Sequence, residues 1–406
     1  MQPKKNSKIN LEVVASHLEA GKRSQNGRLV YDGWALDVAL AALFSAFEFH
    51  SEVVDSGRQR IISDALFSLD PSKLITSKGL VASLARHEAD YLKLPAQRYS
   101  LVTSISAKFG DHFKEIRDGN VRIQFLRDRP ARFDRKPFEG IYSWPKEPDV
   151  KDYTFVVVTV DARTIHEAFE RAVEGLDYHR GMWNYSLTKL TISRSSGSPQ
   201  PLGDIGLGRV HTVHLPTGAA VGETFWYQPS FVPQPVVDVR PDWNRVIEDA
   251  SVVRRKHRRD QYASKFRELF IRYARALDGV DFDSTFLKLW SLLEVLTVTT
   301  RAQYDQTIKR ALFVFREQEL NRVLLEHLRD YRNATVHDAL STDLVHNFNW
   351  QLKQYVDELL RFHVMWSGRF ETWEDAGAFL DLPRDVTALK KRLATSREAL
   401  RYRGGG

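Results

Sequence analysis

The chain has 406 residues, with 59 Lys and Arg against 52 Asp and Glu, 13 His and no cysteine. Its length predicts two or three domains, and its 43% apolar and 27% charged residues exclude a disordered, collagen-like or coiled-coil chain. The absence of cysteine excludes disulfides, cysteine-ligated metals and a thiol nucleophile. Because the sequence shows neither a signal peptide nor about 18 consecutive apolar residues, we expect a cytoplasmic protein with no membrane partner.

The first 242 residues are expected to form a mixed α+β domain. Helices are predicted at three segments rich in helix-forming residues, 34–50, 58–67 and 78–94. Strands are predicted at five β-branched or alternating segments, 99–107, 121–125, 153–160, 187–193 and 209–215. The segment 153–160 is apolar nearly throughout, which predicts a central strand covered on both faces.

A long amphipathic helix is predicted directly after the strand at 153–160. Apolar residues recur at helical spacing from Ile165 to Leu176, and Thr164 with Glu167 is suited to a capping box. Four prolines between residues 229 and 241 then predict an extended connector.

Beyond this connector the sequence shows helical periodicity only. Helices are predicted at five segments, 243–277, 283–298, 301–317, 319–338 and 342–366. The expected fold class is therefore α+β, with a mixed domain at 1–242, an all-α helical bundle at 243–370 and a basic tail at 371–406.

The net charge of +7 is concentrated in one segment. Residues 254–275 contain nine basic and two acidic residues, so the rest of the chain is balanced at 50 of each sign. Five of the basic residues lie at its start: Arg254, Arg255, Lys256, Arg258 and Arg259. Such a cluster is typical of a protein that binds a polyanion such as nucleic acid, although a solvated helix face or linker has the same composition.

The predicted helix at 319–338 carries an unusual polar stripe. At about 100° per residue, Glu326, Asp330, Asn333 and His337 lie along one side, with Arg332 at its edge. On another side, Leu324, Leu328, Tyr331 and Thr335 can face the bundle. The stripe is interpreted either as a polar site or as an exposed surface, and His337 as a site residue or as a core histidine paired with Asp330.

Two segments of the helical region resemble one protein family. The spacing Arg332-Asn333-x-x-x-His337 resembles the R-x(4–6)-H signature of the HEPN superfamily, whose members are helical bundles and in many cases RNases. The segment Phe286–Leu296 resembles the "F-x-x-L-W-x-x-L-E-x-L" helix of its Apea-like branch, and Arg272–Leu277 also fits that branch. The resemblance covers roughly residues 250–366.

The resemblance implies a metal-independent endoribonuclease without a cofactor. Arg332, Asn333 and His337 are the implied catalytic residues, with Asp330 and Glu294 in supporting positions. A histidine exchanges protons near neutral pH, and an arginine presents a fork of donors to phosphate, so both residue types suit attack of a 2′-hydroxyl on the adjacent phosphate. Since one Arg–His pair supplies one titratable group, the family's usual facing of two motifs implies a homodimer.

The implied partners follow from this activity. RNA, with tRNA as one candidate, would lie along the basic residues 254–259. Apea-like relatives suggest antiviral or abortive-infection defence, with the mixed domain as a sensor or restraint and a phage-derived trigger or an antitoxin as its partner. A non-catalytic, dimeric module that binds RNA or protein is the alternative.

Three further signals are assigned no function. His211 and His214 are expected to point to opposite faces of a strand, which argues against a metal site. The glycine-containing segment 203–208 is expected to be a flexible loop, because it lacks the G-x-G-x-x-G spacing. Trp366 and Trp373 are interpreted as bundle packing in preference to a base-stacking platform.

Overall fold

The computed structural model describes residues 1–5, 7–25, 28–109, 114–141, 143–146, 150–188, 200–241, 243–257, 263–300, 303–338, 342–366 and 368–404. The chain is mixed α+β, as the sequence predicts. Within the described ranges, no strand follows residue 243. None of the described helices has the length and apolar character needed to cross a bilayer.

Residues 1–93, called the N-terminal unit below, pack around a hydrophobic core of their own. The elements are β1 (Gln2–Pro3), α1 (Leu11–Gly21), β2 (Lys22–Gln25), β3 (Arg28–Tyr31), α2 (Gly33–Ala46), β4 (Phe47–Glu48), α3 (Asp55–Phe67) and α4 (Ser77–Lys93). Helices α2, α3 and α4 confirm the three predicted helices, whereas α1 and the hairpin β2–β3 were not predicted. Side chains of Asn10, Asp32 and Thr76 cap the starts of α1, α2 and α4.

A six-stranded antiparallel sheet follows, in the order β11-β10-β5-β9-β8-β7. Its strands are β5 (Gln97–Ile105), β7 (Glu115–Asp118), β8 (Val121–Leu126), β9 (Thr154–Ala162), β10 (Val210–His214) and β11 (Ala220–Tyr227). Two short strands, β6 (Ala107–Lys108) and β12 (Val237–Asp238), form a separate parallel pair, and α5 (Lys136–Glu139) lies near β11.

Strand β9 confirms the prediction of a central, doubly covered strand. It lies between β5 and β8, and all nine of its residues pair with β5. Val156, Val158 and Val160 belong to the large core on one face, whereas Val157 packs with Phe133 on the other. Strict alternation along the strand therefore separates two apolar faces.

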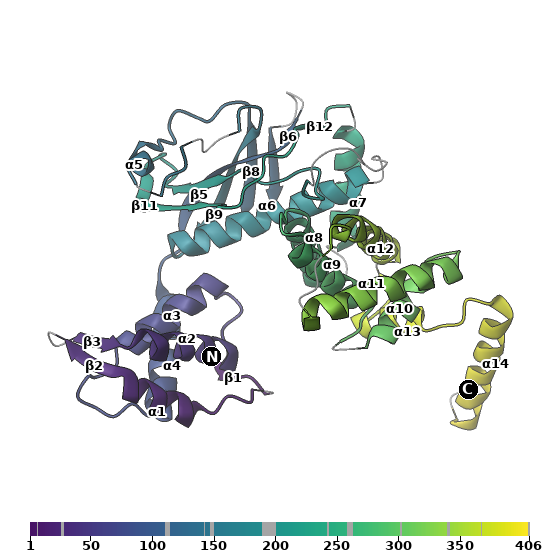
Figure 1. The fold of residues 1–406 in the computed structure, drawn as a ribbon, viewed down its shortest axis with the longest axis horizontal. Coiled ribbons are helices and arrows are strands. Elements are labelled where there is room, and N and C mark those ends of the chain that lie inside the picture. Colours follow the sequence, from purple (N-terminus) through teal and green to yellow (C-terminus); the bar gives the residue numbers. More distant parts are fainter. Residues whose placement is uncertain are drawn as a thin grey trace.

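The predicted amphipathic helix is α6 (Ile165–Thr188), which covers one face of the sheet (Figure 1). Thr164 accepts a hydrogen bond from the Glu167 amide at 3.1 Å, as a capping box requires. In the reciprocal bond, the Glu167 carboxylate accepts from the amide of Arg163 at 3.0 Å. This amide lies one residue before Thr164, whose own amide is the usual donor in a capping box. The helix continues to residue 188, so the predicted strand at 187–193 is wrong at its start, and residues 189–193 lie outside the described part.

The remaining chain forms the predicted helices and two more. They are α7 (Trp243–His257), α8 (Ala263–Leu277), α9 (Phe282–Leu296), α10 (Tyr304–Leu312), α11 (Gln318–Asp338), α12 (Val345–Trp366), α13 (Trp373–Leu380) and α14 (Val386–Tyr402). The predicted helix at 243–277 corresponds to α7 and α8, with residues 258–262 outside the described part.

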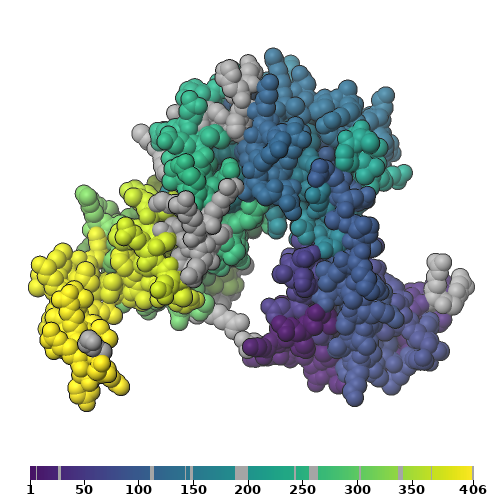
Figure 2. All heavy atoms as spheres, turned by 180° about the vertical axis from the view of Figure 1, so that it is seen from behind, coloured from purple at the N-terminus to yellow at the C-terminus, as the bar shows by residue number. Residues whose placement is uncertain are grey.

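One cluster of buried apolar side chains extends from Tyr99 to Val364, and we call it the sheet–helix core. It includes residues of the sheet, α6 and the C-terminal helices. The N-terminal unit and the C-terminal helices lie on the same side of the sheet and stand apart from each other (Figures 1 and 2). The domain division at residue 242 stays a prediction, since hydrophobic packing also separates the chain near residue 95.

Candidate functional site

Helix α11 carries the predicted catalytic residues and is fixed by its apolar side. Leu328 and Tyr331 are buried, as the helical periodicity predicts. The Tyr331 ring meets Phe286 of α9 edge-on at 4.9 Å and Phe348 of α12 at 5.0 Å. Its hydroxyl donates to Asp283, and burial together with this bond raises the pKa of Tyr331 to about 12. The next residues of the helix are therefore held in a defined orientation.

The structure brings Arg332 and Asn333 together on the half-buried side of α11. The Arg332 guanidinium lies over the ring of Tyr304, 4.9 Å from its centroid, and donates a long hydrogen bond of 3.4 Å to Asn333. Within the described residues, no carboxylate lies within ion-pair distance of this guanidinium. Arg332 thus keeps donors that an anion can use.

His337 lies one helical turn beyond Asn333. Side chains four residues apart on a helix are neighbours, with about 5–6 Å between their Cβ atoms. The backbone of His337 belongs to α11, while its side chain lies outside the described part. The helix therefore places the two positions on one side, as the spacing of the motif predicts.

The two supporting carboxylates differ in their surroundings. Glu294 of α9 accepts a hydrogen bond from the Trp290 indole at 2.9 Å, and Trp290 meets Tyr304 at 6.3 Å between ring centroids. Glu294 is thereby connected to Arg332 through two aromatic rings. Asp330 is 68% exposed and pairs with Arg329 at 3.0 Å, so it is not part of a buried pair in the core.

Much of the basic segment 254–275 is paired within the fold. Four of its cations lie within 4.0 Å of carboxylates, namely Lys265, Arg267, Arg272 and Arg275. Of the five predicted RNA-binding residues, Arg255 is exposed and Arg254 is half-buried. The side chain of Lys256 and the whole of Arg258 and Arg259 lie outside the described residues.

Arg254 contributes to a charged cluster at the end of β7. Asp118 pairs with Arg267 at 2.9 Å and lies 3.7 Å from the buried His179. Burial opposes ionisation of Asp118, but the bond from Arg267 and the charges of Arg267 and Arg254 lower its pKa. Burial also lowers the pKa of His179 to about 3, so this histidine is neutral at pH 7. Two arginines, Arg254 and Arg267, therefore act on the carboxylate of Asp118.

The structure shows the surroundings of the three sequence features to which no function was assigned, beginning with the two histidines. His211 packs against Phe169 of α6, whereas His214 contacts Phe133 and Phe138 on the opposite face of the sheet, which confirms their predicted divergence. In the described residues, no group of three His, Asp or Glu side chains is arranged to hold a metal ion.

The segment 203–208 lies outside the helices and strands, which confirms the prediction of a loop. Asn184 of α6 accepts hydrogen bonds from two of its amides, those of residues 204 and 205, at 2.7 and 2.9 Å, and Ile205 is fully buried. Packing of Trp373 is confirmed by its stacking on His363 at 4.3 Å. Trp366 is 43% exposed and lines an apolar groove.

Tyr304 is the site residue that the sequence did not indicate. It lies 28 residues before Arg332, and its role as a platform depends on α10 packing beside α11. The only local signal is an aromatic residue at the start of a helix, which occurs in many proteins. Tyr304 was therefore recognised as a site residue only from the packing of α10 against α11.

The fold and site define an α+β protein in which a sheet and the C-terminal helices share one core. Helix α11, one of these helices, carries Arg332, Asn333 and His337. No family model, no curated protein and no solved structure matches this chain. The HEPN resemblance accordingly stays a prediction from the sequence motifs.

Proposed function

We propose that the chain is a metal-independent endoribonuclease of the HEPN type, with Arg332, Asn333 and His337 as its catalytic residues. The observation that carries the proposal is the state of Arg332, which is held over Tyr304 without a described carboxylate to neutralise it. A guanidinium in this state suits a phosphate, because it is always charged and presents planar donors.

The proposed reaction needs one proton transfer at each end of the phosphate. A base removes the proton of the 2′-hydroxyl while its oxygen forms a bond to phosphorus, and the bond from phosphorus to the 5′-oxygen breaks. An acid gives a proton to that leaving oxygen, so the products are a 2′,3′-cyclic phosphate and a 5′-hydroxyl. His337 serves as one of these groups, Arg332 stabilises the charged phosphorane, and Asn333 orients the phosphate or the histidine.

The second proton-transfer group is proposed to come from a second copy of the chain. Four buried histidines, His179, His211, His214 and His363, have pKa values lowered to about 3 or 4, chiefly by burial. They remain neutral at pH 7 and are poor candidates for this role. A homodimer that faces two α11 helices would supply two copies of His337.

The basic start of the 254–275 segment is proposed to hold the RNA backbone, with tRNA as one candidate substrate. Arg255 is exposed there, and the neighbouring cluster brings Arg254 and Arg267 to the carboxylate of Asp118. Contacts of this kind weaken as salt is added and read no bases. A defence role in the cytoplasm, with the N-terminal region as sensor of a phage-derived trigger or as the site of an antitoxin, completes the proposal.

The test measures cleavage of labelled tRNA and total RNA by purified protein in the presence of EDTA. Changing His337→Ala or Arg332→Ala is expected to lower cleavage at least about 100-fold, since each removes a proton-transfer or charge-stabilising group. The matched controls are His327→Ala and Arg322→Ala, which alter exposed residues of the same helix and are expected to leave cleavage unchanged.

Two outcomes would contradict the enzymatic proposal. One is equal cleavage by the control and site variants, and the other is the absence of cleavage by wild-type protein on every RNA tested. RNA binding without cleavage, lost in Arg255→Glu and kept in His337→Ala, would favour the non-catalytic binding module instead.

A further inference from the structure

Helix α14 is amphipathic, and its apolar side is uncovered. Val386, Leu389, Leu393 and Leu400 form one stripe along the helix, and between 39% and 62% of each side chain is exposed. No residue of α14 is buried, and the helix stands away from the other elements (Figures 1 and 2). Most helical stability in proteins comes from packing of an amphipathic face, so this uncovered stripe indicates a partner.

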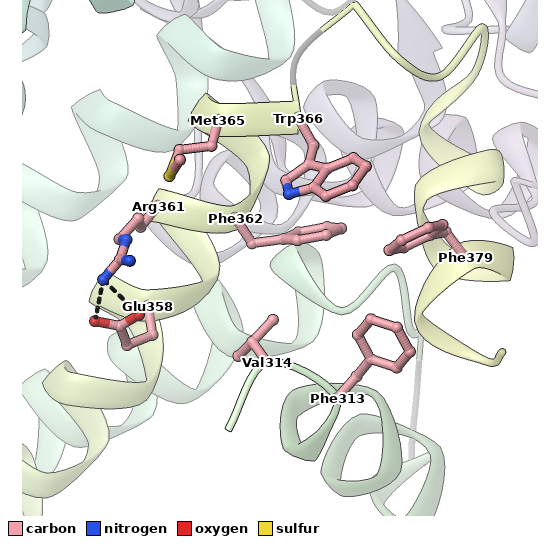
Figure 3. Close-up of a pocket in the computed structure, with 8 residues that line it drawn as sticks. All are labelled: Phe313, Val314, Glu358, Arg361, Phe362, Met365, Trp366 and Phe379. Atoms are coloured by element: carbon pink, nitrogen blue, oxygen red, sulfur yellow. Dashed lines mark hydrogen bonds and ion pairs between the residues drawn. The ribbon is translucent and has the colours of Figure 1, made fainter. Parts of the chain in front are cut away.

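An apolar groove begins beside the root of α14. Its first part is a hollow of about 330 Å³ between α12, α13 and the residues after α10. Figure 3 shows Trp366 and Phe362 on one side of this hollow and Phe379 on the other. Met365 and Trp366, which line the hollow, are 60% and 43% exposed, so the apolar surface continues out of the hollow.

The second part of the groove supplies negative charge. It is a hollow of about 680 Å³ that shares Glu358, Arg361 and Met365 with the first part, so the two are continuous. Asp249, Asp357 and Glu358 line it together with Arg361. Glu358 pairs with Arg361 at 3.4 Å and Asp357 with Lys353 at 2.8 Å, so three carboxylates stand against two cations at this groove.

The charges of α14 are opposite in sign. Its polar positions hold five cations, Lys390, Lys391, Arg392, Arg397 and Arg401, against one carboxylate, Glu398. If two α14 helices paired along their stripes, Lys390, Arg392 and Arg397 would flank the seam and repel their counterparts. Charge repulsion thus disfavours the pairing of two α14 helices, whereas charge attraction favours the binding of α14 in the groove.

The root of α14 holds the helix away from the groove of its own chain in this structure. Only residues 381–385 separate α13 from α14. Asp381 is held by Arg310 at 2.7 Å, and Arg384 donates to the carbonyl of Phe315, a residue that lines the second part of the groove. The helix is thereby anchored at the edge of the groove and directed away from it.

We propose that two copies of the chain exchange their α14 helices, each helix lying in the groove of the other copy. Such an exchange is symmetric and closed, and it uses a short hinge, as exchanged elements commonly do. The inference does not depend on the proposed RNase activity, and it concerns a surface other than the Arg332 helix.

Disulfide trapping tests the exchange directly, because the chain contains no cysteine. Leu393→Cys and Met365→Cys chains are purified separately, mixed and oxidised. The expected product is a covalent dimer of the two different variants. The control pairs Leu393→Cys with Val13→Cys, an exposed residue of the N-terminal unit, and is expected to give little product.

The position of the covalent bond decides between the possible occupants. A dimer of Leu393→Cys with itself would show that α14 pairs with α14. A bond within one chain that carries both cysteines, at low protein concentration, would show that the helix covers its own groove. Either result, or the absence of any covalent product, overturns the proposal.

Sedimentation of otherwise native chains gives an independent measurement. The double change Leu389→Glu with Leu393→Glu is expected to raise the dimer dissociation constant at least about tenfold, since it places charge in an apolar contact. Ala394→Glu with Thr395→Glu is the matched control, because it adds the same charge to the other side of α14. A wild-type chain that is monomeric at tens of micromolar would contradict the exchange.

A complementation experiment sharpens this result. The stripe variant and a groove variant, Trp366→Glu, are each expected to associate more weakly alone than when the two are mixed, because the mixed dimer keeps one intact helix and one intact groove. Failure of the two variants to associate, or loss of RNA binding by the stripe variant with no change in mass, would assign α14 to another role.

Discussion

Helix α6 joins the two ends of the molecule by two different kinds of contact. Toward the N-terminal unit the contact is polar. Glu167 accepts a hydrogen bond from the Tyr91 hydroxyl at 2.8 Å and pairs with Arg163 and Arg171. Glu170 accepts from the first two amides of α3, at 3.0 and 2.9 Å, and so caps that helix from outside its own unit.

Toward α8 the contact is tight and largely buried. Gly181 lies so close to α8 that a Cβ atom on it would stand 2.1 Å from the carbonyl oxygen of Phe270. Arg180, which is fully buried, pairs with Asp177 at 3.0 Å and with Asp278 at 2.5 Å. Both helices contribute to the sheet–helix core.

The difference between these contacts indicates which part of the chain moves independently. The contact with the N-terminal unit consists mainly of hydrogen bonds and ion pairs around Glu167 and Glu170, whereas separating α6 from α8 would also expose core side chains to water. We therefore expect the N-terminal unit to detach before the sheet–helix core opens. A sensor would need this freedom.

Acidification is expected to produce the largest loss of stability. It should destabilise the sheet–helix core more than the N-terminal unit, which reverses the order of opening expected at neutral pH. His179 and His211 have pKa values lowered to about 3, and His214 and His363 to about 4, chiefly by burial. Each is neutral when folded, and the unfolded chain takes up protons below pH about 6.5, so stability is present above that pH and is lost as pH falls. From pH 7 to 5 the loss is on the order of 1–2 kcal/mol for each histidine.

Hydrogen exchange measured at both pH values, corrected for intrinsic rates, locates this loss. All four histidines belong to the part of the chain beyond residue 95, and no histidine described in the N-terminal unit is buried. Protection should therefore fall in the sheet and the C-terminal helices more than in α1–α4. An equal or larger fall in the N-terminal unit would show that the buried histidines do not control acid stability.

Replacing Arg180 is expected to have the next largest effect. Arg180→Ala leaves the carboxylates of Asp177 and Asp278 without their buried partner, and the free energy of unfolding should fall by about 3–5 kcal/mol. Urea unfolding measures the change. Arg275→Ala is the matched control, since Arg275 pairs with the same Asp177 but is 47% exposed, and about 1 kcal/mol or less is expected. Similar losses in the two variants would contradict the distinction.

Glu167→Gln is expected to have the smallest effect of the three and to act on the other contact. The charge that holds Arg163 and Arg171 disappears while the size of the side chain is kept, and about 2 kcal/mol of stabilisation should be lost. Hydrogen exchange should rise in the N-terminal unit alone. Glu174→Gln, on the same helix near Arg275, is the control. Uniform loss of protection across the chain would show that the two contacts are not separable.

Elements with strong periodicity were predicted correctly from the sequence. Helices α2, α3 and α4, strands β5, β8, β9 and β10, and helices α7 to α12 match predicted segments. Strands β2 and β7 were missed, because short segments rich in charged and polar residues show no clear alternation. The strand predicted at 187 failed because α6 continues through residue 188, where packing overrides local β propensity.

In the candidate site, too, the local features could be predicted from the sequence and the long-range contacts could not. The spacing of Arg332, Asn333 and His337 is local, so helical geometry alone places them on one side of α11. The contact of Arg332 with Tyr304, and that of Glu294 with Trp290 beside it, depend on how α9, α10 and α11 pack. No local pattern in the sequence contains that information.

The sequence by itself determined the strongly periodic helices and strands, the polar stripe of α11 and the concentration of charge at 254–275, because these depend on neighbouring residues. Only the tertiary structure decided how that charge is used. Arg267 and Arg275 pair with Asp118 and Asp177, which lie 149 and 98 residues away in the chain. Ion pairs of such separation form only after the sheet, α6 and α8 have packed together, since electrostatic attraction acts over a few ångströms within the fold and not along the sequence.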